Sequence, residues 1–263
     1  MAITGSTKIL YMLAHPIEHV RTPEVFNPIF AARGIDAVMV PLHFFPEAFG
    51  ACWQALRVTQ NLSGIVVSIP LKEMAFKLSD DADESASSVA AANTVRREAD
   101  GRMVCANFDG PGFIAGLLDG GRDAIDKHVL LIGAGGAGTS IAFSLASSGA
   151  ASIDICDLDG KKAAVLAARV RDRHPGVRIA ATGNNPQGHN LIINASPAGL
   201  HPKSDPLPVD VERLEPTMLV ADIIMKPVTT PLLAAAKARG CAVRHGAGML
   251  DYQAELMLSF LGF

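Results

Sequence analysis

The chain has 263 residues, of which 49% are hydrophobic and 19% are charged, and its formal net charge is −3. This composition supplies enough apolar side chains for two modest domains or one large α/β domain, and it argues against intrinsic disorder. The small net charge gives no broad electrostatic reason to expect nucleic acid or an anionic membrane as a partner.

Cysteine usage and the lengths of the apolar runs indicate a soluble, cytoplasmic protein. The cysteines have no C-x-x-C spacing and no accompanying histidine cluster, so we expect neither a metal site nor a disulfide framework, but buried free thiols. The N-terminal MAITGSTK lacks an apolar signal core, and no apolar run approaches the roughly 18 residues of a membrane span. The cysteines are Cys52, Cys105, Cys156 and Cys241.

Strand-like and helical patterns alternate in the first part of the chain. Their order predicts a mostly parallel sheet covered by helices. In the first helix we expect Thr22 as the N-cap, Pro23 at the first helical position and Gly34 at the C-terminal end. The expected strands span 8–14, 36–44 and 64–70, and the expected helices span 22–34 and 46–60.

Residues 89–108 break this alternation. Two strand-like pieces flank Asp100-Gly101, which is the strongest short hairpin signal. A helix is expected to start near Asp109, in the segment 105–125 where turn residues such as Asp119-Gly-Gly concentrate. We therefore expect the boundary between two domains in this segment.

A second α/β series follows the turn-rich segment. Gly240 is expected at the C-terminal end of its third helix. In the last helix, Met249, Leu256 and Phe260 are expected near one face. The expected strands span 128–133, 152–158, 178–182, 190–196, 218–224 and 242–246, and the expected helices span 136–149, 161–176, 230–240 and 248–263.

A G-x-G-x-x-G motif follows the first strand of this series and opens the next helix. The first glycine allows a tight turn, the second lets the backbone approach a pyrophosphate, and the third lets helix and strand pack closely. The pyrophosphate then rests on the amides of the helix N-terminus. A glycine-rich turn without a ligand is the alternative. The predicted dinucleotide-binding residues are Gly133, Ala134, Gly135, Gly136, Ala137 and Gly138.

Asp157 ends the second strand of the series, about 20 residues after Gly138. A carboxylate at this point accepts hydrogen bonds from the adenine-ribose hydroxyls of NAD and repels the 2′-phosphate of NADP. Lys161 and Lys162 could hold that phosphate, although the solvated start of a helix explains them as well. The sequence therefore favours NAD over NADP.

A series of short motifs runs in order across nearly the whole chain: HPIEH and TP, S-x-P-x-K, AANT, N-x-D-G-x-G, GAGGAG, NASPAGL, and TPLL followed by GMLDYQAE. Each motif alone is weak, because a lysine after a strand is usually solvated and an aspartate at a helix start is usually a cap. Together they are specific. The series resembles the shikimate dehydrogenase family, which includes quinate and aminoshikimate dehydrogenases.

The resemblance implies a mostly parallel α/β substrate domain at 1–108, joined by the C-terminal helix 248–263, and a Rossmann domain at 109–247, with the substrate in the cleft between them. It implies hydride transfer between NAD and a ring carbon bearing a hydroxyl, on shikimate, quinate or a related cyclic polyol acid. The catalytic pair would be Lys72 and Asp109. These two groups can exchange the hydroxyl proton, and a protonated lysine stabilises an alkoxide; which group is the base stays open.

The resemblance also assigns the remaining site residues. Asn194 and Ser196 of NASPAGL would lie beside the nicotinamide, and Gly248-Met249 would close over the same ring. The small-molecule substrate would be bound by Thr22, Ser68, Asn93, Asn107 and Gln253.

Three polar positions of the family pattern are changed in this chain. The family's H-S-x-S-P reads His19-Val20-Arg21-Thr22-Pro23, its N-V-T-x-P-x-K has Val66 for the asparagine, and its D-x-x-Y ends in Met225. Each hydrogen bond to a carboxylate contributes roughly 1.5 to 3 kcal/mol, so losing two weakens binding about a hundred-fold or more. Arg21 or Lys226 could compensate.

Several alternatives therefore stay open. The substrate could be a carboxylate-free or aminated ring alcohol. The chain could also be a non-catalytic, nucleotide-responsive binding protein of the same fold, although such a protein needs no proton-transfer pair. A methylenetetrahydrofolate dehydrogenase has a comparable layout but fits N-x-D-G-x-G and GMLDYQAE less well. We expect a monomer or a homodimer.

Overall fold

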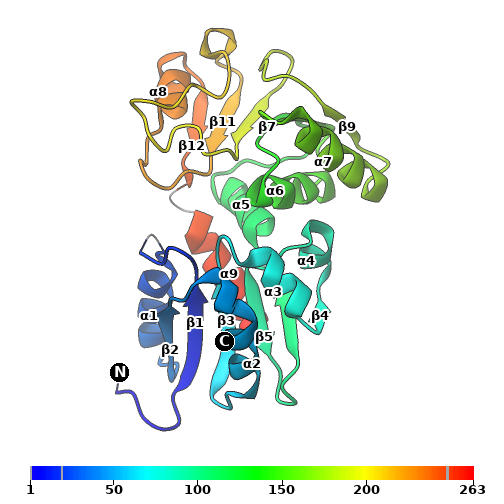
Figure 1. Ribbon diagram of the computed structural model, residues 1–263. Coiled ribbons are helices and arrows are strands. Elements are labelled where there is room, and N and C mark those ends of the chain that lie inside the picture. Colours follow the sequence, from blue (N-terminus) through cyan, green and yellow to red (C-terminus); the bar gives the residue numbers. More distant parts are fainter. Residues whose placement is uncertain (1, 19, 247–248) are drawn as a thin grey trace. The chain divides into compact units, whose positions relative to one another are not determined.

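The computed structural model describes residues 2–18, 20–246 and 249–263. The chain divides into two compact units: unit 1 comprises Met1–Phe108 and Leu250–Phe263, and unit 2 comprises Asp109–Met249. In the described residues each unit contains one six-stranded sheet with helices packed against it (Figure 1). The expected α/β fold class, with two mostly parallel sheets, is confirmed.

Unit 1 is built on a sheet with strand order β2-β1-β3-β5-β6-β4. The strands β2, β1 and β3 are parallel, whereas β5 runs antiparallel to both β3 and β6. The elements are β1 (Lys8–Leu13), α1 (Thr22–Arg33), β2 (Ala37–Leu42), a 3-10 turn (Pro46–Ala48), α2 (Phe49–Val58), β3 (Leu62–Val67), α3 (Lys72–Leu78), β4 (Asp81–Ala82), α4 (Glu84–Val89), β5 (Thr94–Arg97), β6 (Met103–Ala106) and α9 (Met249–Leu261).

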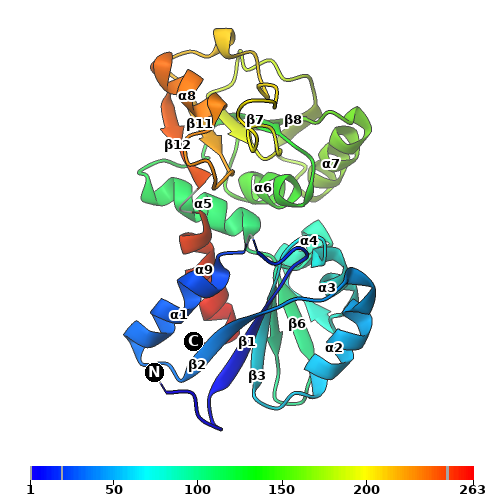
Figure 2. The ribbon, with the colours of Figure 1, turned by 60° about the vertical axis from the view of Figure 1, so that its left-hand side comes forward.

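The strand β1, which is paired with β2 and β3, shows how the unit 1 sheet separates two cores. Its side chains alternate with period two. Leu10, Met12 and Ala14 belong to the core that contains α1 and α9, whereas Tyr11 and Leu13 belong to the core under α2. The helices α1 and α2 consequently lie on opposite faces of the sheet (Figure 2).

The strands β1, β2 and β3 all end at one edge of this sheet, which we call the carboxyl edge of unit 1. Leu13 at the end of β1 pairs with Leu42 of β2 and with Val67 of β3. From β1 the chain crosses to β2 on one side and then returns to β3 on the other side. The boundary between β1 and β3 is therefore a topological switch point, where open α/β sheets commonly bind ligands.

The helix α9 returns the chain from unit 2 to unit 1 and packs against the same core as α1. Its buried face carries Leu250, Gln253, Ala254, Met257, Leu258 and Leu261. Met249, Leu256 and Phe260, predicted near one face, are all half-buried. The polar residues Asp251, Glu255 and Ser259 recur every four positions and are exposed, as on an amphipathic helix whose other side faces a core.

Unit 2 has a sheet of six parallel strands in the order β12-β11-β10-β7-β8-β9. This is the doubly wound order of a Rossmann fold, with its switch point between β7 and β10. The elements are α5 (Asp109–Asp119), β7 (His128–Ile132), α6 (Gly136–Ser147), β8 (Ser152–Cys156), α7 (Gly160–Arg173), β9 (Arg178–Ala181), β10 (Leu191–Asn194), a 3-10 turn (Val211–Arg213), β11 (Leu219–Asp222), α8 (Pro231–Ala238) and β12 (Ala242–Arg244).

Several local predictions can be compared with these elements. The hairpin is confirmed, since β5 and β6 flank the turn that contains Gly101 at φ +88°. The expected N-cap is wrong: α1 begins at Thr22, and Arg21 occupies the cap position without a side-chain bond. Gly34 ends this helix in the left-handed conformation, as expected.

The structure also bears on the expected burial of the cysteines and on the lengths of the apolar helices. All four cysteines are free, but Cys52 and Cys156 are only half-buried, because each side chain is at the margin of its core. Burial raises the pKa of both thiols. Among the described residues, none of the helices has the length and apolar character needed to cross a membrane.

Gly64 tests the packing of α9 on the unit 1 sheet. An added Cβ would contact the Leu261 side chain and would lie 2.8 Å from the backbone oxygen of Val95. We expect Gly64→Ala to lower the free energy of unfolding by about 1–3 kcal/mol, as overpacking does. Urea denaturation followed by circular dichroism measures this change.

The matched control is Gly50→Ala in α2, where a Cβ meets nothing within 4 Å. Because alanine favours the helix, this variant should gain roughly 0.5–1 kcal/mol. Equal stability of the two variants would contradict the close packing of α9.

Candidate functional site

Three predicted substrate-binding residues lie together at the carboxyl edge of unit 1. Ser68 follows β3 and donates its backbone N–H to Leu13 O at 2.8 Å. Asn93 precedes β5, accepts from the Val67 N–H at 2.8 Å and donates its own N–H to Ala106 O. Because β5 is antiparallel to β3 and β6, its beginning meets their ends, and Asn107 directly after β6 reaches the same edge.

The two asparagine side chains at this edge are almost fully buried, with 2% and 1% of their surfaces exposed. Asn93 Oδ1 accepts hydrogen bonds from the Phe108 N–H and the Thr94 hydroxyl, both at 3.0 Å. Asn107 Nδ2 donates to Ala91 O at 3.0 Å. Buried amides held in this way have fixed orientations, which suits them to recognise hydroxyl groups.

Lys72 begins α3 at the same edge. The turn before it is closed by the Leu71 N–H bond to Ser68 O at 2.9 Å, and Lys72 O accepts from the Ala92 N–H at 2.9 Å. The half-buried lysine is thereby tied to the residue that precedes Asn93. The sequence predicted the strand before Lys72 but missed α3, which has seven residues.

Asp109 is the first residue of α5 and also the first residue of unit 2. It is 6% exposed. The next residue, Gly110, donates its N–H to Ser140 Oγ at 2.8 Å, which anchors the start of α5 to α6. The pairing of Asp109 with Lys72 stays a prediction.

The other two predicted substrate-binding residues lie on helices of unit 1. Thr22 is the first residue of α1 and is 5% exposed, and Gln253 lies on the buried face of α9 and is 8% exposed. At two positions where the family pattern has polar residues, this chain has valines with apolar contacts. Val20 packs against the core that contains α1 and α9, and Val66 belongs to that core. His19 lies outside the described residues.

The glycine-rich loop of unit 2 connects β7 to α6. Gly133 has φ +106°, and its N–H bonds Cys156 O at 2.7 Å. A Cβ at Gly138 would collide with the Gly133 backbone, whereas a Cβ at Gly135 or Gly136 would meet nothing within 4 Å. The loop thus requires glycine at two positions for its own conformation and leaves open backbone at the N-terminus of α6, which fits a pyrophosphate group.

Asp157 lies directly beyond β8 and contacts this loop. Its Oδ2 accepts from the Ala134 N–H at 2.7 Å, and its Oδ1 accepts from the Asp159 N–H at 2.9 Å. These bonds fix a half-buried negative charge beside the glycine-rich turn. The nearby Lys161 and Lys162 are exposed at the start of α7.

A buried network holds the loop that contains Ser196. The fully buried Asn194 donates through Nδ2 to Ala198 O at 3.0 Å and to Asp222 Oδ2 at 3.1 Å, and its Oδ1 accepts from the Ser196 hydroxyl at 2.6 Å. Asp222 Oδ2 also accepts from the Thr230 hydroxyl at 2.8 Å. The buried Asn194 side chain therefore holds the conformation of this loop through its hydrogen bonds to Ser196 and Ala198.

Asp222 and Thr230 are members of this network that the sequence analysis missed. Burial raises the pKa of Asp222, while bonds from Ile224, Thr230 and Asn194 act in the opposite direction. The only available signal was their place in the D-x-x-Y and TPLL motifs. Of the remaining predicted residues, Met249 begins α9 and is half-buried, and Gly248 lies outside the described residues.

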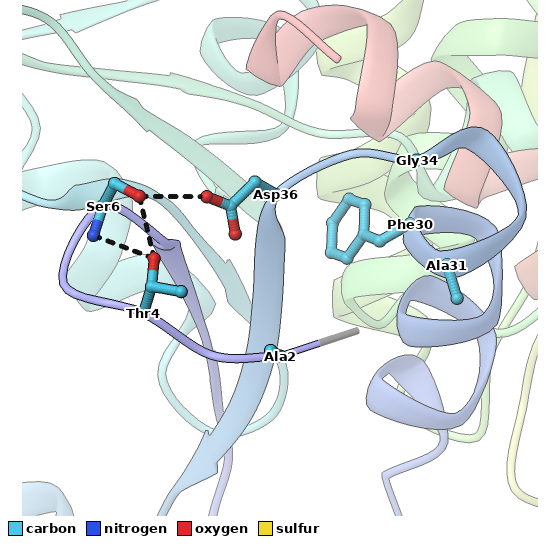
Figure 3. A pocket seen from close by; sticks show the side chains of 7 residues that line it. All are labelled: Ala2, Thr4, Ser6, Phe30, Ala31, Gly34 and Asp36. Atoms are coloured by element: carbon cyan, nitrogen blue, oxygen red, sulfur yellow. Dashed lines mark hydrogen bonds between the residues drawn. The ribbon is translucent and has the colours of Figure 1, made fainter.

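One pocket of about 500 Å³ lies at the opposite edge of unit 1. Ser6 Oγ donates to Asp36 Oδ2 and bonds the Thr4 hydroxyl, so the polar side chains of the pocket bind one another (Figure 3). These residues precede β1 and β2, and the pocket is therefore separate from the carboxyl edge. The described residues contain no group of three His, Cys, Asp or Glu side chains able to hold a metal ion.

Comparisons with known proteins agree on one family. The profile of the shikimate dehydrogenase substrate binding domain matches residues 12–95. A shikimate dehydrogenase (NADP(+)) of Geobacillus kaustophilus is 35% identical over 95% of this chain and 90% of its own.

Two solved structures extend this comparison. Shikimate 5-dehydrogenase from Listeria monocytogenes, in complex with shikimate and NAD, has a TM-score of 0.90 and 28% identity over 99% of this chain and 93% of its own. The 5-ketofructose reductase of Gluconobacter sp. strain CHM43 has a TM-score of 0.89 and 29% identity over 97% and 93%.

Gly135 and Gly138 should respond differently to alanine. Gly135→Ala adds a methyl group that touches no protein atom, so we expect an unchanged thermal midpoint but dinucleotide binding weakened about tenfold or more, because the backbone can no longer approach the pyrophosphate. Gly138→Ala should lower both the thermal midpoint and the affinity for the dinucleotide, because its Cβ would collide with the Gly133 backbone. Thermal unfolding and calorimetric titration with NAD measure the two effects. Unweakened NAD binding by Gly135→Ala would exclude this loop as the pyrophosphate site.

Proposed function

Because the chain belongs to the shikimate dehydrogenase family, we propose that it is an NAD-dependent dehydrogenase of shikimate, quinate or a related cyclic polyol acid. The chain is an oxidoreductase of this family, and its cofactor is a nicotinamide dinucleotide. The observation that carries the proposal is the gathering of Ser68, Lys72, Asn93 and Asn107 at the carboxyl edge of unit 1.

Unit 1 supplies the substrate ligands in this proposal. The buried amides of Asn93 and Asn107 and the hydroxyl of Ser68 bind ring hydroxyls, and Thr22 and Gln253 bind further oxygen substituents. Their orientations are fixed by burial and by backbone bonds, so the ring is held with one hydroxyl toward Lys72. Each neutral hydrogen bond contributes about 0.5–1.5 kcal/mol to binding.

Lys72 and Asp109 move the proton in the proposed reaction. A nicotinamide dinucleotide held by the glycine-rich loop and Asp157 would supply the acceptor for the hydride of the carbinol carbon. The hydroxyl proton must leave in the same reaction, and the Lys72 amine takes it while the Asp109 carboxylate stabilises the resulting ammonium. In the reverse direction the ammonium returns the proton to the forming alkoxide and stabilises its negative charge.

The position of Asp157 supports NAD as the cofactor. Its carboxylate is held beside the glycine-rich loop by the Ala134 N–H, where it can accept hydrogen bonds from the ribose hydroxyls. A 2′-phosphate would bring negative charge against it. The relative from Geobacillus kaustophilus is named for NADP(+), whereas the matched structure from Listeria monocytogenes contains NAD. The charge at Asp157 leads us to choose NAD.

A carboxylate-free polyol is the second candidate substrate. It is favoured by Val20 and Val66, which contact the apolar core at positions where the family pattern has polar groups. It is also favoured by the similarity to a 5-ketofructose reductase, whose substrate name denotes a sugar without a carboxylate. Comparing kcat/KM for shikimate, quinate and 5-ketofructose, each with NAD(H) and NADP(H), decides between the two. NAD binding without turnover of any of them would instead indicate a non-catalytic binding protein.

Lys72→Ala tests the proton-transfer role. We expect kcat to fall by roughly two or more orders of magnitude, as is usual when a general acid–base is lost, with the affinity for NAD unchanged. Absorbance of the reduced nicotinamide measures turnover, and calorimetry measures NAD binding. The control is Lys77→Ala, an exposed lysine of the same helix α3, which should retain full activity. Equal activity of the two variants removes Lys72 from the mechanism.

Asp157→Ser tests cofactor choice. Removing the carboxylate should narrow the preference for NAD over NADP about tenfold or more, because the repulsion of the 2′-phosphate is lost. Asp159→Ser is the matched control, since Asp159 caps α7 by accepting from the Lys161 N–H, and serine can keep that cap. The ratio of kcat/KM values for the two cofactors measures the effect. An unchanged ratio in Asp157→Ser would mean that this carboxylate does not face the ribose.

A further inference from the structure

Two histidines stand side by side at the carboxyl edge of unit 1. His15 lies two residues beyond β1 and His43 directly follows β2, and the register that pairs Leu13 with Leu42 brings them together. His15 Nδ1 and His43 Nε2 are 3.1 Å apart, and their ring centroids are separated by 5.2 Å. The register of two parallel strands thus produces a hydrogen-bonded imidazole pair.

His15 is the member of the pair nearer to the proposed substrate ligands. Its backbone N–H bonds Ile69 O at 3.1 Å, and Ser68 N–H bonds Leu13 O, so His15 neighbours the end of β3. Adjacent strands are about 4.8 Å apart, which puts His15 one strand from Ser68 and His43 two strands away. A six-membered ring bound at Ser68 is therefore within reach of His15. His43 lies on the far side of His15 from Ser68.

The contact between the two rings limits which nitrogen atoms can bind a substrate. A hydrogen bond between Nδ1 of His15 and Nε2 of His43 uses one proton. When His43 donates this proton, or when the pair carries an extra proton, His15 Nε2 bears hydrogen and donates outward. When His15 donates, its Nε2 is an acceptor. His43 thus fixes the ring of His15 and leaves Nε2 directed away from the pair.

Apolar side chains flank the His15 ring. The Phe45 ring centroid is 5.8 Å from it, and 74% of the Phe45 surface is exposed. Ile69, which accepts the His15 N–H, is 62% exposed. Large exposed apolar residues around a half-buried polar group are typical of a ligand-binding surface.

We propose that His15 binds, through Nε2, an oxygen substituent of the ring substrate other than the reacting hydroxyl, and that His43 is the positioning residue that orients it. The proposal rests on the function proposed above. For an acid substrate the oxygen belongs to the carboxylate, and His15 Nε2–H replaces a hydrogen bond absent at Val20 and Val66. For a carboxylate-free substrate the oxygen belongs to a hydroxyl, which the pair can serve in either protonation pattern.

Two substitutions at position 15 separate binding from structure. The amide of His15→Asn reaches the place of Nδ1, so it keeps the contact with His43 but loses Nε2. The longer amide of His15→Gln reaches the place of Nε2. We expect His15→Asn to raise KM for the substrate about tenfold or more, with kcat and KM for NAD within about twofold, and His15→Gln to restore most of the loss.

His43→Ala and His43→Gln test the positioning role. We expect His43→Ala to raise KM about threefold to tenfold without lowering kcat, and His43→Gln, which retains a donor toward His15, to stay close to the unsubstituted protein. The control is His128→Gln at the start of β7, whose ring bonds Ser152 in unit 2. It should change none of these constants.

The experiment measures KM and kcat for shikimate, quinate and the methyl ester of shikimate, together with equilibrium binding by calorimetry and the thermal midpoint. A larger effect of His15→Asn on the acid than on the ester identifies the bound oxygen as the carboxylate, and equal effects identify a hydroxyl. Unchanged KM and Kd in His15→Asn overturn the proposal. So does a parallel loss of kcat and thermal midpoint in both His15 variants, which indicates a structural role.

Failure of the proposed function gives a different result. If the protein binds these compounds but does not turn them over, the dehydrogenase proposal is wrong, and the Kd values of the variants still decide the role of His15. If it binds neither these three compounds nor 5-ketofructose while binding NAD, both proposals are overturned.

Discussion

The parallel pairing of β1 with β2 and β3 is the constraint on which the unit 1 site depends. Parallel strands joined by crossover helices end at the same edge, so residues that follow them become neighbours however far apart they lie in the chain. Ser68, His15 and His43 meet in this way, and the antiparallel β5–β6 hairpin adds Asn93 and Asn107. A one-residue slip in register would turn these side chains to the other face.

Unit 2 applies the same constraint with a different local chemistry. Its switch point is surrounded by backbone rather than by side chains, because Gly133 and Gly138 approach each other too closely to tolerate a Cβ. Side chains hold the neighbouring loops: Asp157 binds the glycine-rich turn, and the network of Asn194, Asp222 and Thr230 joins the loops after β10 and β11. In the proposed function, unit 1 therefore binds the substrate with polar side chains, whereas unit 2 binds the dinucleotide with exposed backbone amides.

The sequence was sufficient where a signal is local, and it failed where packing decides. Alternating apolar runs and glycine turns predicted the two sheets, the hairpin and the end of α1 at Gly34. The short α3 was missed, because its seven residues are too few for a helical period to stand out. The contact of His15 with His43 depends on the register between β1 and β2, which no local pattern encodes.

The return of α9 to unit 1 has a consequence for synthesis on the ribosome. The core shared by β1 and α1 is completed by Ala254, Met257, Leu258 and Leu261, which are translated after all of unit 2. At roughly 5–20 residues per second, the intervening segment of about 140 residues takes on the order of ten seconds to make. During that interval the part of the nascent sheet that α9 covers is exposed to chaperones, and unit 1 lacks its last helix until unit 2 has been translated.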